Sequence, residues 1–185
     1  MGTALNRVLE KQHLPQKSMA EIRPVASHGA SGLITLGELD GNRIILNLPL
    51  CGVIFWAEYE LHFTDETVLF GGVNELLLKL AEQNIVWGII TNKPHVFTDR
   101  LLPKLECSVK PSVVVSGDTT SAPKPSTIPM FYACRQIGVA PENCMYVGDA
   151  ERDMQAGRQA GMITVLQTGV TSVPQTIQRV GQLIM

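Results

Sequence analysis

The chain has 185 residues, of which 45% are hydrophobic and 17% are charged, and its formal net charge at pH 7 is -2. This length suits one globular domain or one domain with a modest insertion, and the composition excludes disordered, collagen-like and coiled-coil chains. Fifteen basic residues against 17 acidic ones do not provide the basic surface on which affinity for nucleic acid depends. A duplex-binding function is therefore not expected.

Cysteine and histidine usage gives no sign of a metal cage or a disulfide framework. The four cysteines show no C-x-x-C spacing and the four histidines are scattered singly, which fits a reducing compartment. The N-terminus carries no apolar signal segment, and the longest uncharged stretch, 44–57, is too short to span a bilayer and contains Pro49 and Gly52. These features predict a soluble cytoplasmic protein without a membrane partner.

The first sixty or so residues have helical patterning. Apolar residues fall at helical spacing over 4–10, the glycine-rich cluster at 28–32 is expected to open another helix or turn, and 54–63 reads as a half-buried helix. Strands and helices do not alternate in this part, so an all-helical N-terminal region is predicted.

From Gly71 onward the pattern changes to strands and helices in alternation. Near-continuous apolar runs mark strands that are covered on both faces. Strands are expected over 85–90, 113–115, 144–147 and 163–166, and helices over 73–82, after Pro94, and over 127–136 and 152–160. This order predicts an α/β fold with a doubly wound parallel sheet, whose ligands bind beyond the carboxyl ends of the strands.

Polar clusters follow three of the predicted strands. They are Thr91-Asn92-Lys93, then Ser116-Gly117-Asp118 with Lys124-Pro125 a few residues later, and Gly148-Asp149. A hydroxyl and backbone N–H groups suit phosphate oxygens, a lysine neutralises them, and a carboxylate binds a hard cation. Together these clusters predict a phosphate ester site with a magnesium ion.

Each cluster also has a structural interpretation. Thr91-Asn92 is typical of a helix cap or turn, Lys124-Pro125 of a loop, and Gly148-Asp149 of a helix N-cap whose carboxylate meets the helix dipole. Their joint order at consecutive strand ends favours the functional interpretation.

The segments 88–93, 124–125 and 146–162 resemble the second, third and fourth motifs of haloacid dehalogenase-like hydrolases, within which the chain is similar to the phosphoglycolate phosphatase group. The fourth motif, G-D-x-x-x-D with a trailing A-G-x-x-A-G-M, is the most specific part. The resemblance implies a Rossmann-like core over 69–185 and an incomplete N-terminal helical cap over 1–68.

The resemblance also implies roles for the polar clusters. Thr91 would bind the transferring phosphoryl group with help from Asn92, and Lys124 would neutralise that group and position the nucleophile. These three residues are the expected catalytic and substrate-binding set.

The same resemblance implies a Mg²⁺ cofactor and a cap that selects the substrate. Asp149 would ligate the metal ion and Asp153 would support the metal shell. In the cap, His28 and Gly29 are the expected substrate-facing residues.

The family's first motif, D-x-D-x-T after an apolar strand, is not found in the chain. We interpret Glu38-Leu39-Asp40-Gly41-Asn42 as a coincidental loop because it has Glu at the nucleophile position. Two explanations for the missing motif are open. Either the gene start or a trimmed chain omits it, or the motif is truly lost. The fold should then lack its first central strand, so that the strands before Thr91 and Asp149 pair directly or leave unpaired edges. Low stability, aggregation and negligible turnover are expected.

The function expected from these features is a magnesium-dependent phosphomonoesterase of the phosphoglycolate phosphatase type, using an aspartyl-phosphate mechanism. A non-catalytic phosphate-binding remnant and a sugar-phosphate phosphatase, such as one for N-acetylmuramic acid 6-phosphate, are the alternatives. A nucleotide-binding protein is disfavoured because no G-x-G-x-x-G or P-loop follows a predicted strand. The expected partner is a small phosphorylated metabolite, and the sequence does not indicate the oligomeric state.

Overall fold

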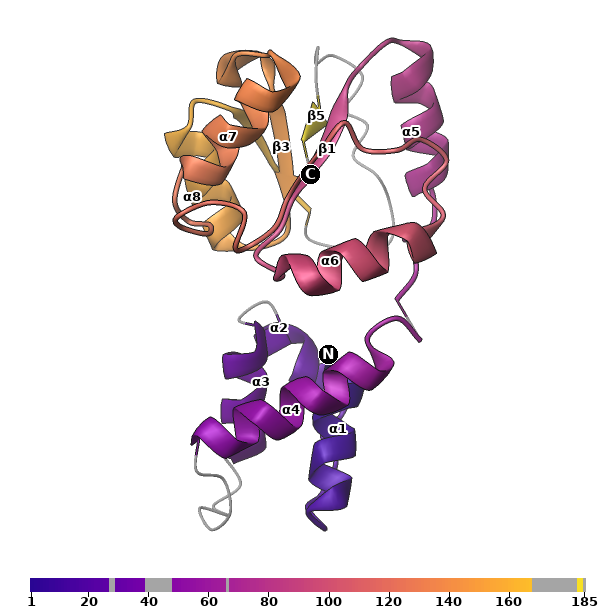
Figure 1. Cartoon of the computed structure of the whole chain (residues 1–185), viewed down its shortest axis with the longest axis vertical. Coiled ribbons are helices and arrows are strands. Elements are labelled where there is room, and N and C mark those ends of the chain that lie inside the picture. The colour runs from indigo at the N-terminus through magenta and orange to yellow at the C-terminus, as the bar shows by residue number, and fades with distance from the viewer. Residues whose placement is uncertain (27–28, 39–47, 66, 168–182, 185) are drawn as a thin grey trace. The chain divides into compact units, whose positions relative to one another are not determined.

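The chain forms two compact units, Met1–Thr67 and Val68–Met185, so the division lies one residue before the boundary expected from the sequence. A computed structural model describes residues 1–26, 29–38, 48–65, 67–167 and 183–184 of the chain (Figure 1). Each unit is described by itself.

The first unit is helical, as predicted, over the residues that the structure describes. Its helices are α1 (Gly2–Lys11), α2 (Met19–Ala26), α3 (Gly29–Glu38) and α4 (Leu48–His62). Their buried faces supply the core of the unit, which includes Leu5, Leu9, Ile22, Leu33 and Phe55. Within the described part of the chain, no helix is long and apolar enough to cross a bilayer.

Local signals explain where these helices lie. A capping box precedes α2, because the Ser18 backbone N–H donates to Glu21 Oε2 over 2.8 Å and the Glu21 N–H donates to Ser18 Oγ over 3.3 Å. In α4, the rings of Phe55 and Tyr59 stack with centroids 6.3 Å apart, one helical turn from each other. Residues 33–38 are helical, so no strand leads toward the acidic segment at 38–42, whose last four residues lie outside the described part.

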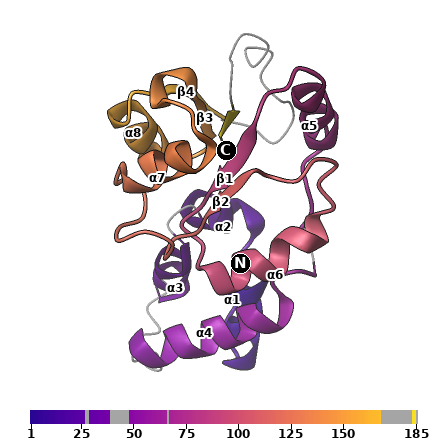
Figure 2. The same cartoon turned by 45° about the horizontal axis from the view of Figure 1, so that its top comes forward.

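The second unit is the predicted doubly wound parallel α/β fold. Its elements are α5 (Val73–Glu82), β1 (Trp87–Ile90), α6 (His95–Leu101), the 3₁₀ helix η1 (Leu102–Leu105), β2 (Val113–Val115), α7 (Ile128–Ile137), the 3₁₀ helix η2 (Pro141–Asn143), β3 (Met145–Gly148), α8 (Glu151–Gln159), β4 (Ile163–Leu166) and β5 (Leu183–Ile184). The sheet has the order β2-β1-β5-β3-β4 and every adjacent pair is parallel (Figure 2).

The two faces of the sheet bury different side chains because successive residues of a strand point to opposite sides. Met145 and Trp87 pack with Leu77 and Leu80 of α5. The next residue of β3, Tyr146, packs on the other face in the core that α7 and α8 help to form. Side chains of β3 thus alternate between two hydrophobic cores, and Tyr146 places a polar group in one of them.

The expectation that β1 and β3 pair directly, or leave two unpaired edges, is wrong. Strand β5 lies between them, with Leu183 opposite both Trp87 and Met145, and Ile184 opposite both Gly88 and Tyr146. This parallel strand from a distant part of the chain pairs with two residues of each neighbour, where a first central strand would otherwise supply the backbone partners. These pairs involve the N-terminal halves of β1 and β3, away from the ends that carry the polar clusters.

Candidate functional site

Two of the predicted clusters lie at the carboxyl edge of the sheet. Thr91 and Asn92 directly follow β1, and Asp149 directly follows β3. The Thr91 backbone N–H donates to the carbonyl oxygen of Val115 over 2.8 Å, which extends the pairing of β1 with β2 up to the edge. The Thr91 hydroxyl oxygen accepts from the backbone N–H of Lys93 over 3.1 Å. The turn after β1 is therefore fixed by short-range hydrogen bonds.

The Asn92 side chain fastens this turn to the Lys124 loop. Its Nδ2 donates to the Lys124 carbonyl oxygen over 2.9 Å, and its Oδ1 accepts from the Lys124 backbone N–H over 3.0 Å. This reciprocal pair resembles one rung of a strand ladder and joins two loops that are far apart in the sequence. In the structure, Asn92 positions Lys124.

Gly117 lets the loop after β2 approach the same turn. Its backbone N–H donates to the Lys93 carbonyl oxygen over 2.9 Å. A β-carbon at position 117 would lie 2.3 Å from the Asn92 carbonyl oxygen, a distance that real contacts do not reach. This position therefore accepts only glycine without a shift of the backbone.

The Lys124 side chain is buried at the edge of the sheet, with 9% of its surface exposed. Its Nζ lies 2.8 Å from the Ile90 carbonyl oxygen, 2.8 Å from the Tyr146 hydroxyl and 2.7 Å from Asp153 Oδ1. Burial lowers the pKa of Lys124 below its ordinary value, and the hydrogen bond and charge of Asp153 oppose that shift. Asp149 acts in the same direction as Asp153, whereas Arg152 adds to the lowering. The nearby carboxylates thus offset part of the effect of burial on the ammonium.

Asp153 is the buried partner of that ammonium. While Oδ1 faces Lys124, Oδ2 accepts from the Ala150 backbone N–H over 3.1 Å at the start of α8. This second bond is the N3 half of a capping box. Both oxygens of Asp153 are thus engaged with protein groups, which suits a residue that positions Lys124 and the start of α8.

Asp149 is the carboxylate of the fourth motif that is exposed at the edge of the sheet. Carboxylate oxygens are the protein ligands of Mg²⁺, which usually takes only one or two of them together with water and substrate phosphates. The residues present fit such an ion, with Asp149 as the direct ligand and Asp153 behind it. Over the residues described, no three His, Cys, Asp or Glu side chains come close enough together to form a cage for a metal.

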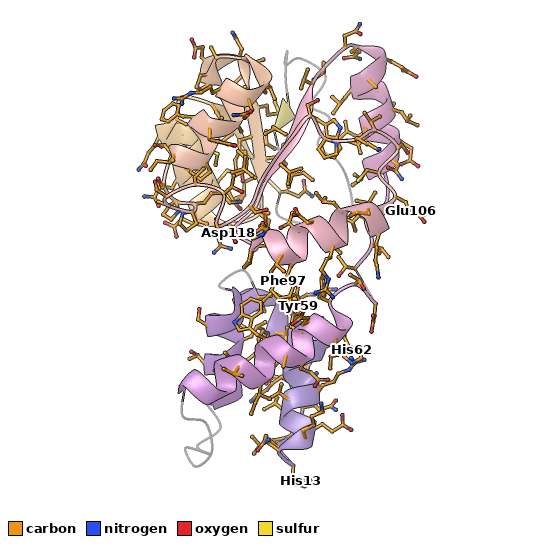
Figure 3. The ribbon with its side chains drawn as sticks, in the orientation of Figure 1. His13, Tyr59, His62, Phe97, Glu106 and Asp118 are labelled. Carbon is orange, nitrogen blue, oxygen red and sulfur yellow. The ribbon has the colours of Figure 1, made fainter. Side chains whose placement is uncertain are left out.

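The remaining predicted residues take other places. Asp118, after β2, lies near the start of α6 (Figure 3). It pairs there with His95: Asp118 Oδ1 accepts from the His95 backbone N–H, and Asp118 Oδ2 lies 2.8 Å from His95 Nδ1. Of the two cap residues, Gly29 begins α3 in the first unit with a φ of 71°, and His28 lies outside the described residues.

Tyr146 is the residue in contact with the Lys124 ammonium that the sequence did not predict. The apolar run around Tyr146 predicts a buried strand, which is correct, and it gives no role to the hydroxyl. Tyr146 is 1% exposed, and a buried tyrosine hydroxyl usually requires a polar partner. A tyrosine just before Val-Gly-Asp in an otherwise apolar strand is the signal that was available.

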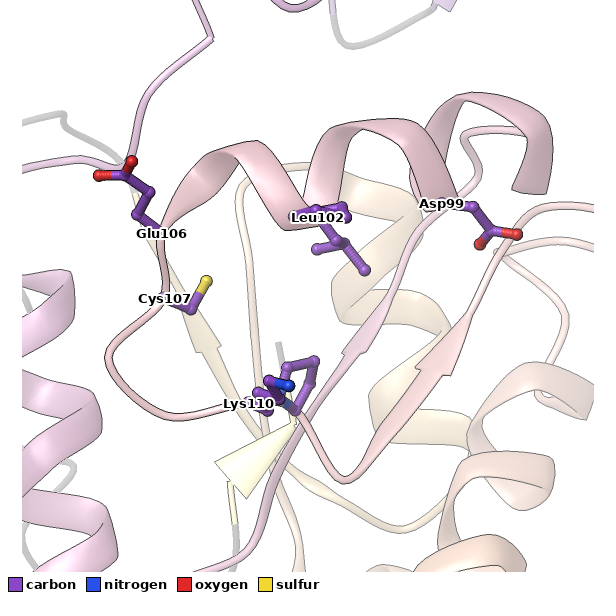
Figure 4. Close-up of a pocket in the computed structure, with 7 residues that line it drawn as sticks. Asp99, Leu102, Glu106, Cys107 and Lys110 are labelled. Atoms are coloured by element: carbon purple, nitrogen blue, oxygen red, sulfur yellow. The ribbon is translucent and has the colours of Figure 1, made fainter.

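A cavity of about 500 Å³ lies elsewhere in the second unit, beside α6 and η1 (Figure 4). Its lining includes Asp99, Glu106, Cys107 and Lys110. Burial raises the pKa of the Cys107 thiol, which disfavours the reactive thiolate. This cavity therefore offers no activated nucleophile, and it does not contain the residues of the predicted phosphate site.

Comparison with known proteins gives consistent matches along most of the chain. Residues 3–167 match the family model described as haloacid dehalogenase-like hydrolase. A phosphoglycolate phosphatase of Xanthomonas campestris pv. campestris is 36% identical over 167 residues, which are 89% of this chain and 74% of that relative. An N-acetylmuramic acid 6-phosphate phosphatase of Pseudomonas aeruginosa is 29% identical over 165 residues, 87% of this chain and 71% of that relative.

Solved structures support the same fold. The crystal structure of a predicted phosphoglycolate phosphatase from Haemophilus somnus 129PT superposes with a TM-score of 0.79 at 22% identity, covering 99% of this chain and 85% of that one. A haloacid dehalogenase superfamily hydrolase from Geobacter sulfurreducens superposes with a TM-score of 0.70 at 18% identity, covering 98% and 81% of the two chains.

Proposed function

The chain belongs to the haloacid dehalogenase-like hydrolase family, and on this basis we propose that it serves the hydrolysis of a small phosphate monoester. Phosphoglycolate is the first candidate because relatives at 36% and 37% identity are phosphoglycolate phosphatases. N-acetylmuramic acid 6-phosphate is the second, from relatives at 29% and 28% identity.

One observation carries the proposal: a buried ammonium, that of Lys124, lies at the carboxyl edge of a parallel sheet. Burying a lysine is costly unless its charge is paired. Ionisable side chains whose pKa is shifted by burial and by a charged partner concentrate at functional sites. The edge is also where ligands of open α/β sheets bind. A phosphate dianion is the ligand that this charge and the neighbouring Thr91 hydroxyl would recognise.

The proposed roles follow from the contacts. Lys124 neutralises the phosphoryl oxygens, Asn92 keeps the Lys124 loop against the turn after β1, and the Thr91 hydroxyl donates to a phosphoryl oxygen. Asp149 holds Mg²⁺, and Asp153 keeps Lys124 charged. When bound, the ion supplies positive charge that offsets the charge of the phosphoryl group in the transition state.

We propose that these 185 residues bind phosphate esters without appreciable turnover. The sequence contains no Asp-x-Asp, the pair from which the resemblance draws its nucleophile. In another hydrolase, removal of the nucleophile lowers kcat by on the order of 10⁶-fold. Under this proposal the phosphate site is intact, but the chemical step requires a nucleophilic carboxylate that these residues do not supply.

Calorimetric titration with inorganic phosphate, with and without MgCl₂, tests the site. Binding that Mg²⁺ strengthens and that Asp149→Asn weakens is the expected result. Asp118→Asn is the matched control, since it removes an exposed carboxylate from the loop after a different strand. If Asp149→Asn and Asp118→Asn bind phosphate equally well in Mg²⁺, the metal assignment is wrong.

A hydrolysis assay tests turnover with three esters: 2-phosphoglycolate, N-acetylmuramic acid 6-phosphate and p-nitrophenyl phosphate. We expect rates at the level of buffer for all three. A rate above buffer that disappears in Asp149→Asn would contradict the proposed lack of turnover and would identify the substrate class directly.

A further inference from the structure

The Lys124 ammonium has as many hydrogen-bond donors as it has neighbouring acceptors. An ammonium carries three N–H donors. The three acceptors at 2.7–2.8 Å belong to three different elements: Ile90 on β1, Tyr146 on β3 and Asp153 on α8. The contacts with Ile90 and Asp153 involve a main-chain carbonyl and a charged partner. The Tyr146 hydroxyl is the neutral side-chain acceptor of the set.

The Tyr146 hydroxyl is itself placed by the same two partners. It lies 3.3 Å from the Ile90 carbonyl oxygen and 3.4 Å from Asp153 Oδ1, so that it can donate its one hydrogen to either of them while accepting from Lys124. Burial raises the pKa of Tyr146 above its ordinary value, and the charge and hydrogen bond of Asp153 raise it further. The hydroxyl therefore keeps its proton.

The contact between Tyr146 and Lys124 is made through the hydroxyl and not through the ring face. The Lys124 Nζ lies 5.5 Å from the ring centroid and 2.8 Å from the hydroxyl oxygen that projects from that ring. The ammonium therefore lies beyond the hydroxyl, where attraction to the ring face contributes little. Removal of the hydroxyl alone tests the interaction.

We propose that Tyr146 is a positioning residue for Lys124: its hydroxyl accepts one N–H of the ammonium and holds the charged Nζ at the carboxyl edge of the sheet. The proposal rests on the proposed function, because it assigns Lys124 to phosphate. Without the hydroxyl, one N–H of a buried ammonium loses its acceptor, and the lysine reorients before it meets an anion. Tyr146 acts through Lys124 and does not touch the phosphate.

Tyr146→Phe removes the hydroxyl and keeps the ring. Tyr132→Phe is the matched control, because Tyr132 packs against the same hydrophobic core and has no contact with the Lys124 ammonium in the described part of the chain. Inorganic phosphate is the probe. We expect Tyr146→Phe to bind it about tenfold more weakly than the wild type and Tyr132→Phe to bind it equally well.

A second measurement does not depend on phosphate. In ¹H–¹⁵N spectra tuned to lysine ammonium groups, a buried and fully hydrogen-bonded ammonium exchanges slowly enough to be seen, and Lys124→Met identifies its signal. We expect this signal in the wild type with a nuclear Overhauser effect to the Tyr146 ring. The signal should vanish or shift in Tyr146→Phe and persist in Tyr132→Phe.

The outcomes separate the two proposals. An unchanged ammonium signal and unchanged phosphate affinity in Tyr146→Phe would overturn the role of Tyr146. Absence of phosphate binding in the wild type would overturn the proposed function, and the ammonium spectra would still decide the contact between hydroxyl and lysine. If Tyr146→Phe does not fold, the Overhauser effect in the wild type decides instead, and its absence counts against the proposal.

Discussion

A β-carbon on Gly148 would lie 2.4 Å from the β-carbon of Asp153 and 2.9 Å from its Oδ2. The last residue of β3 and the first turn of α8 therefore touch, and only a hydrogen at position 148 leaves room for the carboxylate that holds Lys124. Close packing against Asp153 thus requires glycine at position 148, independently of any contact with a ligand.

Gly148→Ala tests this close approach. The added methyl group should displace Asp153 and lower the free energy of unfolding by about 1–3 kcal/mol, as overpacking of a filled core does. Urea unfolding measures the change. Gly71→Ala is the control, because a β-carbon there meets no atom within 4 Å, and equal losses in the two variants would contradict the explanation.

The ion pair of Lys124 and Asp153 should be costly to break on one side. Asp153→Asn leaves a buried ammonium without its charged partner, and a loss of about 3–5 kcal/mol in the free energy of unfolding is expected. The double variant Lys124→Met/Asp153→Leu removes both charges and should recover much of this loss. If the double variant is less stable than the single one, the pair contributes more than its desolvation costs.

Asn92 is expected to matter for the site beyond its effect on stability. Asn92→Ala removes two hydrogen bonds to the Lys124 backbone and should weaken phosphate binding severalfold. Asn74 makes a similar pair of bonds, to the Glu106 carbonyl and the Ser108 N–H, away from the site. Both Asn92→Ala and Asn74→Ala should lower the free energy of unfolding by about 1–3 kcal/mol. Asn74→Ala should leave phosphate binding unchanged in a titration.

The pair of His95 and Asp118 predicts a titration. Hydrogen bonding and charge from Asp118 raise the pKa of His95 above its ordinary value, and the pKa of Asp118 is lowered mainly by its hydrogen bond to His95. Stability from the raised His95 pKa is present below about pH 6.5 and is lost as the pH rises through the folded pKa. Stability from the lowered Asp118 pKa is present above its unfolded pKa and is lost as the pH falls through the folded one.

An NMR titration of the His95 ring measures this effect. Asp118→Asn should return the pKa of His95 toward its ordinary value, and Asp99→Asn should lower it by less, since the charge of Asp99 is the smaller influence. An unchanged His95 pKa in Asp118→Asn would refute the pairing.

Strand β5 makes a prediction about the centre of the sheet. Proline has no backbone N–H for the ladder, so Ile184→Pro should lower the free energy of unfolding by about 1–3 kcal/mol and reduce hydrogen-exchange protection in β1 and β3. Ile184→Val keeps the N–H and is the control. Unchanged exchange at Gly88 and Tyr146 in the proline variant would show that these pairs do not form in solution.

Much of the second unit could be predicted from local pattern. The strands at 113–115 and 163–166 have the predicted bounds, because β-branched residues there are flanked by turn residues or glycine. The turn residues after β1 and β3 also pointed to the correct edge of the sheet.

Other features depend on tertiary contacts that no local pattern encodes. A strand of two residues, such as β5, has no measurable periodicity and is defined only by its neighbours. The pairing of Asp153 with Lys124 follows from the packing of α8 on β3, so no local pattern in the sequence predicts that one oxygen of this carboxylate faces the lysine. The apolar pattern of its strand does not predict a hydrogen-bonding role for the Tyr146 hydroxyl.

The position of β5 also has a consequence for the folding kinetics of the second unit. Its partners β1 and β3 precede it by long stretches of chain, so the middle of the sheet closes only after an extensive loss of chain entropy. Until then, two strand edges in the centre of the unit remain exposed to other chains. Refolding of this unit should accordingly be slow, and its yield should fall as the protein concentration rises.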